Sequence, residues 1–150
     1  MRRVYSNTRG FTLVELIVVV GILGILALMA LQTFNRYVVT VRINRTIADL
    51  RTLDKAILAY YIDKNALPTT LQEAGMGGQL DAWTRPYEYQ LLGGGAPALE
   101  DSLGLPLNEL YDLYSKGIDG GTAVSAADAS AADDIVRSND GQYVGPRAGL

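Results

Sequence analysis

The chain has 150 residues, enough for one domain of ordinary size together with a membrane anchor. Its 16 acidic and 13 basic residues give a net charge of −3, which argues against non-specific binding of nucleic acid. The sequence contains no Cys and no His. Disulfide bonds are therefore excluded, soft or borderline metals are disfavoured, and only a site of oxygen ligands for a hard cation stays open.

The first ten residues are short and basic and contain no apolar stretch. An ordinary secretory signal carries its apolar core before the cleavage position, whereas here the apolar run starts after Gly10. Cleavage after Gly10 would place a new amino group on Phe11, one helical turn from Glu15. Arg2 and Arg3 would keep the N-terminus on the cytoplasmic side of a membrane, with the rest of the chain outside it.

The apolar run from Phe11 to Leu31 contains a single charged residue, Glu15. A helix over this range is about 31 Å long, close to the thickness of the hydrocarbon core of a membrane. A carboxylate in such a span costs about 2.5–3.5 kcal/mol, so it indicates a functional site with a cation as its partner. The alternative is a Glu near the end of an ordinary anchor, with its carboxylate reaching the lipid headgroups.

The helix is expected to continue beyond the apolar run as an amphipathic helix. Apolar residues recur there at steps of three and four, at Ile43, Ile47, Leu50, Leu53, Ile57 and Tyr60 or Tyr61. No proline interrupts the segment before Pro68, which together with Asn65 supplies a stop signal. We predict one helix of about 50 residues. A coiled coil is the alternative, but the steps follow no strict heptad.

The rest of the chain consists of short apolar pieces broken by Gly and Pro. A turn after Leu67 has a possible N-cap at Thr69 or Thr70, which would open a short helix. Strands are expected at Tyr87 to Leu91 and at Glu109 to Tyr114. A small antiparallel sheet packed on the long helix would bury the apolar face of both, so the predicted fold class is α+β.

A specific motif stands at the start of the apolar run, Arg9-Gly10-Phe11-Thr12-Leu13-Val14-Glu15. Together with the run that follows, it resembles the leader and first helix of type IV pilins and of the pseudopilins of type II secretion. The resemblance implies cleavage between Gly10 and Phe11 and N-methylation of Phe11 by a prepilin peptidase. It also implies that Glu15 pairs with the Phe11 amine of a neighbouring subunit in a helical filament.

The second half of the chain resembles the major pseudopilin of type II secretion in several short pieces. These are Asp81–Tyr89, Tyr111–Gly120 and Asp133–Ile135, with Tyr60 and the Pro68–Thr70 turn. The resemblance implies a calcium site with Asp119, Asp133 and Asp134 as side-chain ligands and the Lys116 carbonyl as a backbone ligand. Adjacent carboxylates repel each other unless a cation bridges them, and Ca²⁺ binds oxygen ligands. The alternative is that Asp133 and Asp134 are a solvated acidic pair beside a flexible loop.

These expectations divide the chain into four parts. They are a leader that is removed (1–10), a transmembrane and filament-core helix (11–31), the amphipathic half of the same helix (32–63), and a periplasmic globular domain with a C-terminal metal-binding loop (64–150). Catalysis is not expected, because the sequence offers no His or Cys as base or nucleophile and no phosphate-binding glycine motif.

The predicted function is that of a structural subunit in a helical pseudopilus that drives protein export through the type II secretion system. The expected partners are other copies of the chain, the prepilin peptidase, the inner-membrane assembly platform and minor pseudopilins, with no nucleic acid. The precursor would cross the bacterial inner membrane once. Two alternatives are a type IV pilin of surface fibres for adhesion, motility or DNA uptake, and a monomeric binding module that keeps its first ten residues.

Overall fold

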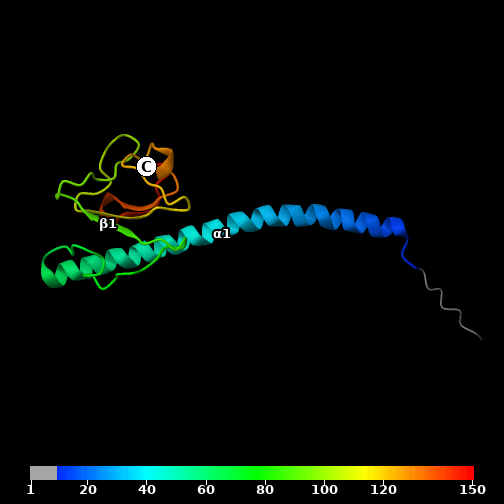
Figure 1. The fold of residues 1–150 in the computed structure, drawn as a ribbon, viewed down its shortest axis with the longest axis horizontal. Helices are drawn as coiled ribbons and strands as arrows, with labels where there is room; N and C mark the ends of the chain where they lie inside the picture. The colour runs from blue at the N-terminus through cyan, green and yellow to red at the C-terminus, as the bar shows by residue number, and fades with distance from the viewer. Residues whose placement is uncertain (1–9) are drawn as a thin grey trace, which may run out of the picture. The chain divides into compact units, whose positions relative to one another are not determined.

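The computed structural model describes residues 10–150, without the side chain of Gln32 (Figure 1). It contains one long helix, two short 3-10 helices and four strands, in the order α1 (Leu13–Lys64), β1 (Glu88–Leu91), β2 (Tyr111–Ser115), η1 (Ala129–Ala131), β3 (Ile135–Ser138), η2 (Asn139–Gly141) and β4 (Tyr143–Pro146). The predicted α+β class is confirmed. The structure divides into two compact units, with the division between Val39 and Thr40.

The end of α1 follows from local chemistry. Asn65 has a φ of 51°, in the left-handed region that commonly closes a helix, and its amide N–H donates to the Tyr61 carbonyl at 2.8 Å. Pro68 follows three residues later and cannot continue a helix. The stop signal predicted from Asn65 and Pro68 is confirmed.

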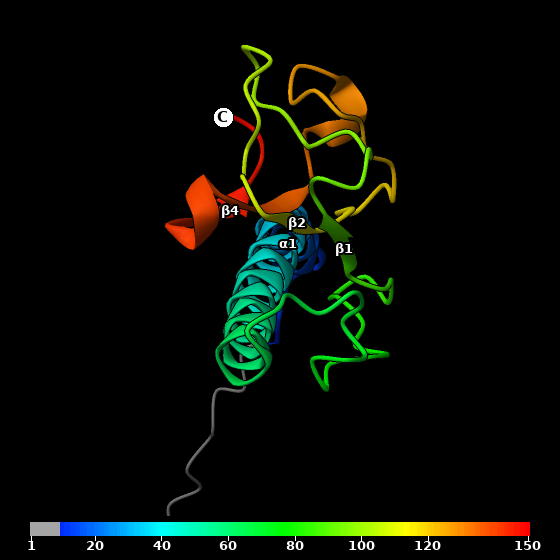
Figure 2. The same cartoon turned by 90° about the vertical axis from the view of Figure 1, so that its left-hand side faces the viewer.

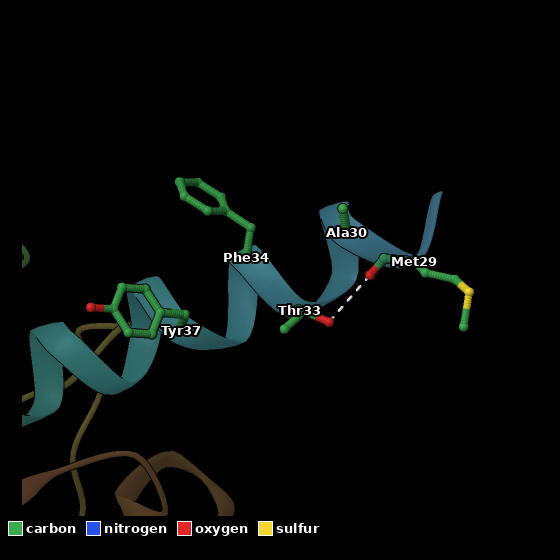
Figure 3. Close-up of a pocket in the computed structure, with 5 residues that line it drawn as sticks. All are labelled: Met29, Ala30, Thr33, Phe34 and Tyr37. Carbon is green, nitrogen blue, oxygen red and sulfur yellow. Dashed lines mark hydrogen bonds between the residues drawn. The ribbon is translucent and has the colours of Figure 1, made fainter. Parts of the chain in front are cut away.

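In the first unit, α1 is long and apolar enough to cross a membrane. Its large apolar side chains are exposed along the whole segment, including Leu13 (74 %), Leu28 (67 %) and Phe34 (63 %). Toward the end of this unit, Met29, Ala30, Thr33, Phe34 and Tyr37 line an open apolar concavity. Figure 3 shows the ring of Phe34 standing away from the helix. This surface is suited to an apolar environment.

In the second unit, α1 packs on the sheet through the predicted apolar stripe. Leu50, Leu53 and Ile57 are fully buried, and Ile43 and Ile47 pack against the same cluster from the edge. The sheet side of this main core consists of Tyr87, Tyr111, Leu113, Ile135 and Val144. Amphipathic packing of the second half of α1 is therefore confirmed.

The four strands form one antiparallel sheet in the order β1-β2-β3-β4 (Figure 2). Glu88 pairs with Tyr114, and Ile135 pairs with Pro146. All five residues of β2 are buried, because α1 covers one side of the sheet and a second cluster of Leu99, Leu107, Tyr114 and Val136 forms beside it. Strands β1 and β2 lie within one or two residues of their predicted bounds, whereas β3 and β4 were not predicted.

The short helix expected at Thr69 or Thr70 is absent from the described residues, so this prediction is wrong. The N-cap chemistry is nevertheless present, since the Thr69 amide N–H donates to Glu73 Oε2 at 2.7 Å and the Glu73 amide N–H to Thr70 Oγ1 at 3.4 Å. Residues 71–75 form only a turn. Gly75, with a φ of 74°, reverses the chain before a second helical turn can follow.

A polar network joins α1 to the sheet inside the main core. Asp54 Oδ1 accepts hydrogen bonds from the Tyr111 hydroxyl at 2.6 Å and from Arg137 Nε at 2.5 Å. The Arg137 guanidinium also lies 4.2 Å from the Tyr111 ring centroid and donates to Asn108 Oδ1 at 2.9 Å. Asn108 Nδ2 in turn donates to Asp112 Oδ1 at 2.9 Å. The network connects the helix with β2 and β3 through directional contacts.

Candidate functional site

The first candidate site lies at the start of α1. Gly10 and Phe11 precede the helix in non-helical backbone, and the Phe11 side chain is 86 % exposed. The leader predicted at 1–10 lies outside the described residues except for Gly10. The Gly10–Phe11 bond thus lies in an exposed, non-helical stretch, residues 10–12, directly before the helix.

Thr12 and Glu15 form a reciprocal cap on the helix. The Thr12 amide N–H and hydroxyl both donate to Glu15 Oε2 at 2.9 Å, and the Glu15 amide N–H donates to Thr12 Oγ1 at 3.2 Å. Since α1 begins at Leu13, Thr12 is the N-cap and Glu15 the third helical residue, which is the arrangement called a capping box. It satisfies two backbone donors that a helix N-terminus otherwise leaves unpaired.

The capping box holds the Glu15 carboxylate against Thr12, the residue next to Phe11. The partner predicted for Glu15 is the Phe11 amine of another subunit, whereas its partner in the structure is Thr12 of the same chain. A signal for it was present, because Thr or Ser followed three residues later by Glu before an apolar run is a sequence signature of this cap.

The second candidate site is the loop where calcium was predicted. Asp133 Oδ2 accepts the amide N–H groups of Ile118 at 2.5 Å and of Asp119 at 3.0 Å. Asp119 Oδ1 accepts the Gly121 amide N–H at 2.7 Å, and the Lys116 carbonyl accepts the Gly120 amide N–H at 3.1 Å. The structure therefore brings Lys116, Asp119 and Asp133 together around the turn at residues 117–119. All three accept backbone hydrogen bonds there.

Asp134 points into the interior. It is fully buried, and its Oδ2 accepts hydrogen bonds from Thr122 Oγ1 at 2.7 Å and from Arg147 Nη1 at 3.2 Å. Its Oδ1 is buried and has no hydrogen-bond partner among the described residues. Burial raises the pKa of Asp134 to about 6, although the hydrogen bonds from Thr122 and Arg147 act to lower it.

Two arginines that the sequence did not mark as site residues bind the backbone of this region. Arg85 donates from Nη1 to the Gly117 carbonyl and from Nη2 to the Ile118 carbonyl, the latter at 3.0 Å. Arg147 is fully buried and donates to carbonyls on the far side of the loop as well as to Asp134. The spacing of the sequence gives no signal for these contacts, because each arginine binds oxygens distant along the chain.

The oxygens around Asp134 have one feature of a cation site. An unpartnered, buried Asp134 oxygen is what a cation ligand would leave. However, among residues 10–150 no group of three or more Asp, Glu, His or Cys side chains lies together in a way that could hold a metal. Asp134 also pairs with the Arg147 guanidinium, whereas Asp119 and Asp133 accept backbone N–H groups. The arrangement therefore does not fit the three-carboxylate site, and calcium binding stays a prediction.

Comparison with known proteins bears on the N-terminal site. Residues 5–31 match the family model of the prokaryotic N-terminal methylation motif. The matched range contains Gly10, Phe11, the Thr12–Glu15 cap and the apolar run. No curated protein and no solved structure matches the chain. The start of this chain thus has the motif of a type IV pilin-like precursor, and this supports a type IV pilin-like family for the protein.

Proposed function

We propose that the mature chain is a structural subunit of a helical filament, and that this filament is a pseudopilus that drives protein export through a type II secretion system. The observation that carries the proposal is the methylation motif at residues 5–31, which places one carboxylate, Glu15, in an apolar segment. In this proposal, a prepilin peptidase cleaves the chain between Gly10 and Phe11 and methylates the new Phe11 amine.

The exposed apolar surface of α1 supports assembly. Between Leu13 and Tyr37, large apolar side chains are more than a third exposed on every side of the helix. Such a surface is stable only in lipid or against other apolar helices. Before assembly the helix lies in the inner membrane, with the Thr40–Leu150 unit in the periplasm. In the filament, the same side chains pack against helices of other copies.

The position of Glu15 supports a second role for its carboxylate. The capping box holds Oε2 beside Thr12, the residue that follows Phe11, and Glu15 is exposed, which supports a carboxylate accessible to an amine of another copy. An unpaired charge in an apolar filament core costs about 3–5 kcal/mol. Pairing Glu15 with the Phe11 amine of a neighbouring subunit removes this cost only when the copies are in register.

The first experiment is N-terminal sequencing of the mature protein from its native host. The expected mature N-terminus is N-methylated Phe11. A mature protein that starts at Met1 would remove the filament proposal and favour a membrane-anchored monomer.

Variants of the capping box separate the charge of Glu15 from its role as a cap. Glu15→Gln keeps a side-chain acceptor for the Thr12 amide but removes the charge, whereas Thr12→Ala weakens the cap and keeps the charge. Glu73→Gln is the matched control, because Glu73 is an exposed carboxylate that also accepts a backbone N–H.

Both Glu15→Gln and Glu15→Ala should be inserted and processed but should yield few filaments, while Thr12→Ala and Glu73→Gln should assemble much better. Filament yield is measured by electron microscopy and sedimentation. If Glu15→Gln assembles normally while Thr12→Ala and Glu15→Ala fail, the carboxylate acts only as a cap and the charge-pairing proposal is refuted.

A type IV pilin that forms surface fibres is the second candidate, since the methylation motif is shared by pilins and pseudopilins. The two functions differ in where the filament lies. Immunogold labelling of intact cells should show no extracellular fibres if the protein is a pseudopilin, and its deletion should abolish secretion of exported proteins. Long labelled fibres with normal secretion would favour the pilin.

A further inference from the structure

The C-terminal loop encloses a positive charge that belongs to the chain itself. The side chain of Arg147, at the end of the sheet after β4, has no exposed surface. A charged guanidinium is rarely buried to this extent unless its N–H groups are matched by oxygen acceptors. The acceptors around Arg147 therefore indicate what this residue does.

Arg147 binds four oxygens from three separate segments. Nη1 donates to the Ala123 carbonyl at 2.7 Å and to Asp134 Oδ2 at 3.2 Å. Nη2 donates to the Val124 carbonyl and, at 2.9 Å, to the Glu100 carbonyl. Three carbonyls and a carboxylate are the types of oxygen that a hard metal ion takes as ligands. Here a planar guanidinium with several fixed donors occupies that position.

Backbone hydrogen bonds near Arg147 also hold the C-terminal loop closed. The Glu100 amide N–H donates to the Val124 carbonyl at 2.8 Å, and the Ala126 amide N–H donates to the Glu100 carbonyl at 3.0 Å. The Arg147 amide N–H itself donates to the Asp134 carbonyl at 2.8 Å. The loop from Gly121 to Asp134 is thus attached at both ends to segments that Arg147 also contacts.

The charges around Asp134 disfavour a second cation. Asp134 and Arg147 form a neutral buried ion pair, so a divalent ion at Asp134 would lie a few ångströms from a guanidinium in a region of low dielectric constant. Each member of the pair has one buried atom without a partner among the described residues, Asp134 Oδ1 and Arg147 Nε. One is an acceptor and the other a donor. A water molecule can satisfy both kinds of atom, whereas a metal ion would be repelled by Nε–H.

We propose that the guanidinium of Arg147 is the structural cation of the C-terminal loop, and that the loop is held closed by this residue without a divalent metal. In chemical terms, Arg147 performs the task that a disulfide or a metal ion would perform in closing such a loop. The proposal concerns the globular unit alone and holds whether or not the chain forms filaments.

The first test uses the wild-type full chain in a mild detergent. Its thermal unfolding is followed by near-ultraviolet circular dichroism in millimolar calcium and in excess EDTA, and calcium binding is measured by equilibrium dialysis. The proposal expects the same midpoint in both solutions and no stoichiometric binding. A midpoint that rises by several degrees in calcium, falls again with EDTA and becomes insensitive in Asp119→Ala would overturn the proposal and establish calcium as the cation.

The second test replaces Arg147. Arg147→Met removes the charge and leaves Asp134 buried without its cation, so the midpoint should fall by about 10 °C or more. Arg147→Lys keeps the charge but cannot span the same four oxygens, and its midpoint should lie between those of Arg147→Met and the wild type. Arg51→Met is the matched control, since Arg51 is exposed, and it should change the midpoint by about 2 °C or less.

A third measurement covers the case in which Arg147→Met does not fold. Limited proteolysis of Arg147→Lys should then cut faster than the wild type between Gly121 and Asp134, while Arg51→Lys should be cut at the wild-type rate. Equal cleavage rates in Arg147→Lys and the wild type, or equal midpoints in Arg147→Met and Arg51→Met, would show that the guanidinium does not close the loop.

Discussion

Asp54 offers a direct test of what holds α1 on the sheet. Its Oδ1 accepts hydrogen bonds from the Tyr111 hydroxyl at 2.6 Å and from Arg137 Nε at 2.5 Å. The Arg137 side chain is only 3 % exposed and that of Asp54 14 %. Substitution of Asp54 by Ala removes the carboxylate and leaves a guanidinium buried beside an unpaired hydroxyl.

The loss of stability expected for Asp54→Ala depends on the contacts that Arg137 keeps. Removal of one member of a buried ion pair typically costs about 3–5 kcal/mol. Arg137 would keep Asn108 Oδ1 at 2.9 Å, Asp140 Oδ1 at 3.8 Å and the Tyr111 ring at 4.2 Å, so the cost should lie near the lower end of that range. Loss of the acceptor for Tyr111 adds about 1 kcal/mol. We therefore expect a loss of about 4 kcal/mol in the free energy of unfolding.

The assay is urea unfolding of the full chain in a mild detergent, followed by fluorescence of Trp83. The chain has a single Trp, and this residue packs against the main core, so the signal reports the unit that contains the network. Asp63→Ala is the matched control, because Asp63 lies on the same helix and its pair with Lys64 is exposed. The control should change stability by about 0.5 kcal/mol or less.

A double variant completes the design. If the two residues act as a pair, Asp54→Ala with Arg137→Met should be less destabilised than the sum of the two single variants. The reasoning is refuted if Asp54→Ala costs no more than Asp63→Ala, since the position of α1 on the sheet would then depend on apolar packing alone.

Two further predictions concern the turn at Gly117 and the buried tyrosines. Gly117 has a φ of 58°, and a Cβ there would lie 2.2 Å from the Asp133 carbonyl oxygen, so Gly117→Ala should cost about 2–4 kcal/mol. A Cβ at Gly94 would meet nothing within 4 Å, so Gly94→Ala should change the thermal midpoint little. Similar melting curves for Gly117→Ala and Gly94→Ala would contradict the prediction. Burial raises the pKa of Tyr89 and Tyr114 to about 12 and also raises the pKa of Tyr87 and Tyr111. The folded state therefore binds these phenol protons more tightly than the unfolded chain, and this contribution to stability is present below pH 10 and lost as the pH rises through the folded pKa values. At about pH 11, the phenolate absorbance of the folded protein should be lower than that of the protein in urea, because these four tyrosines stay protonated in the folded state. Identical titration curves in the two solutions would show that the tyrosines are not protected.

The sequence alone determined the features of this protein that depend on neighbouring residues. The steps of three and four from Ile43 to Ile57 identified the buried face of α1, and Asn65 with Pro68 identified its end. The methylation motif and the lone charge of Glu15 are equally local, and so is the Thr12–Glu15 cap, whose signature was present but was not used. In each case the information lies within a few residues, so chain order is sufficient.

Only the tertiary structure decided which charges are buried and what they pair with. Arg137 binds Asp54 across 83 positions of the chain, and Arg147 binds Glu100 across 47. Nothing in the spacing of these residues distinguishes them from exposed arginines. Strands β3 and β4 were not predicted from the sequence either, and their pairing with β2 and with each other stabilises them. The physical reason is that a buried charge or a short strand is stable only beside partners that packing brings together, and chain order does not contain that packing.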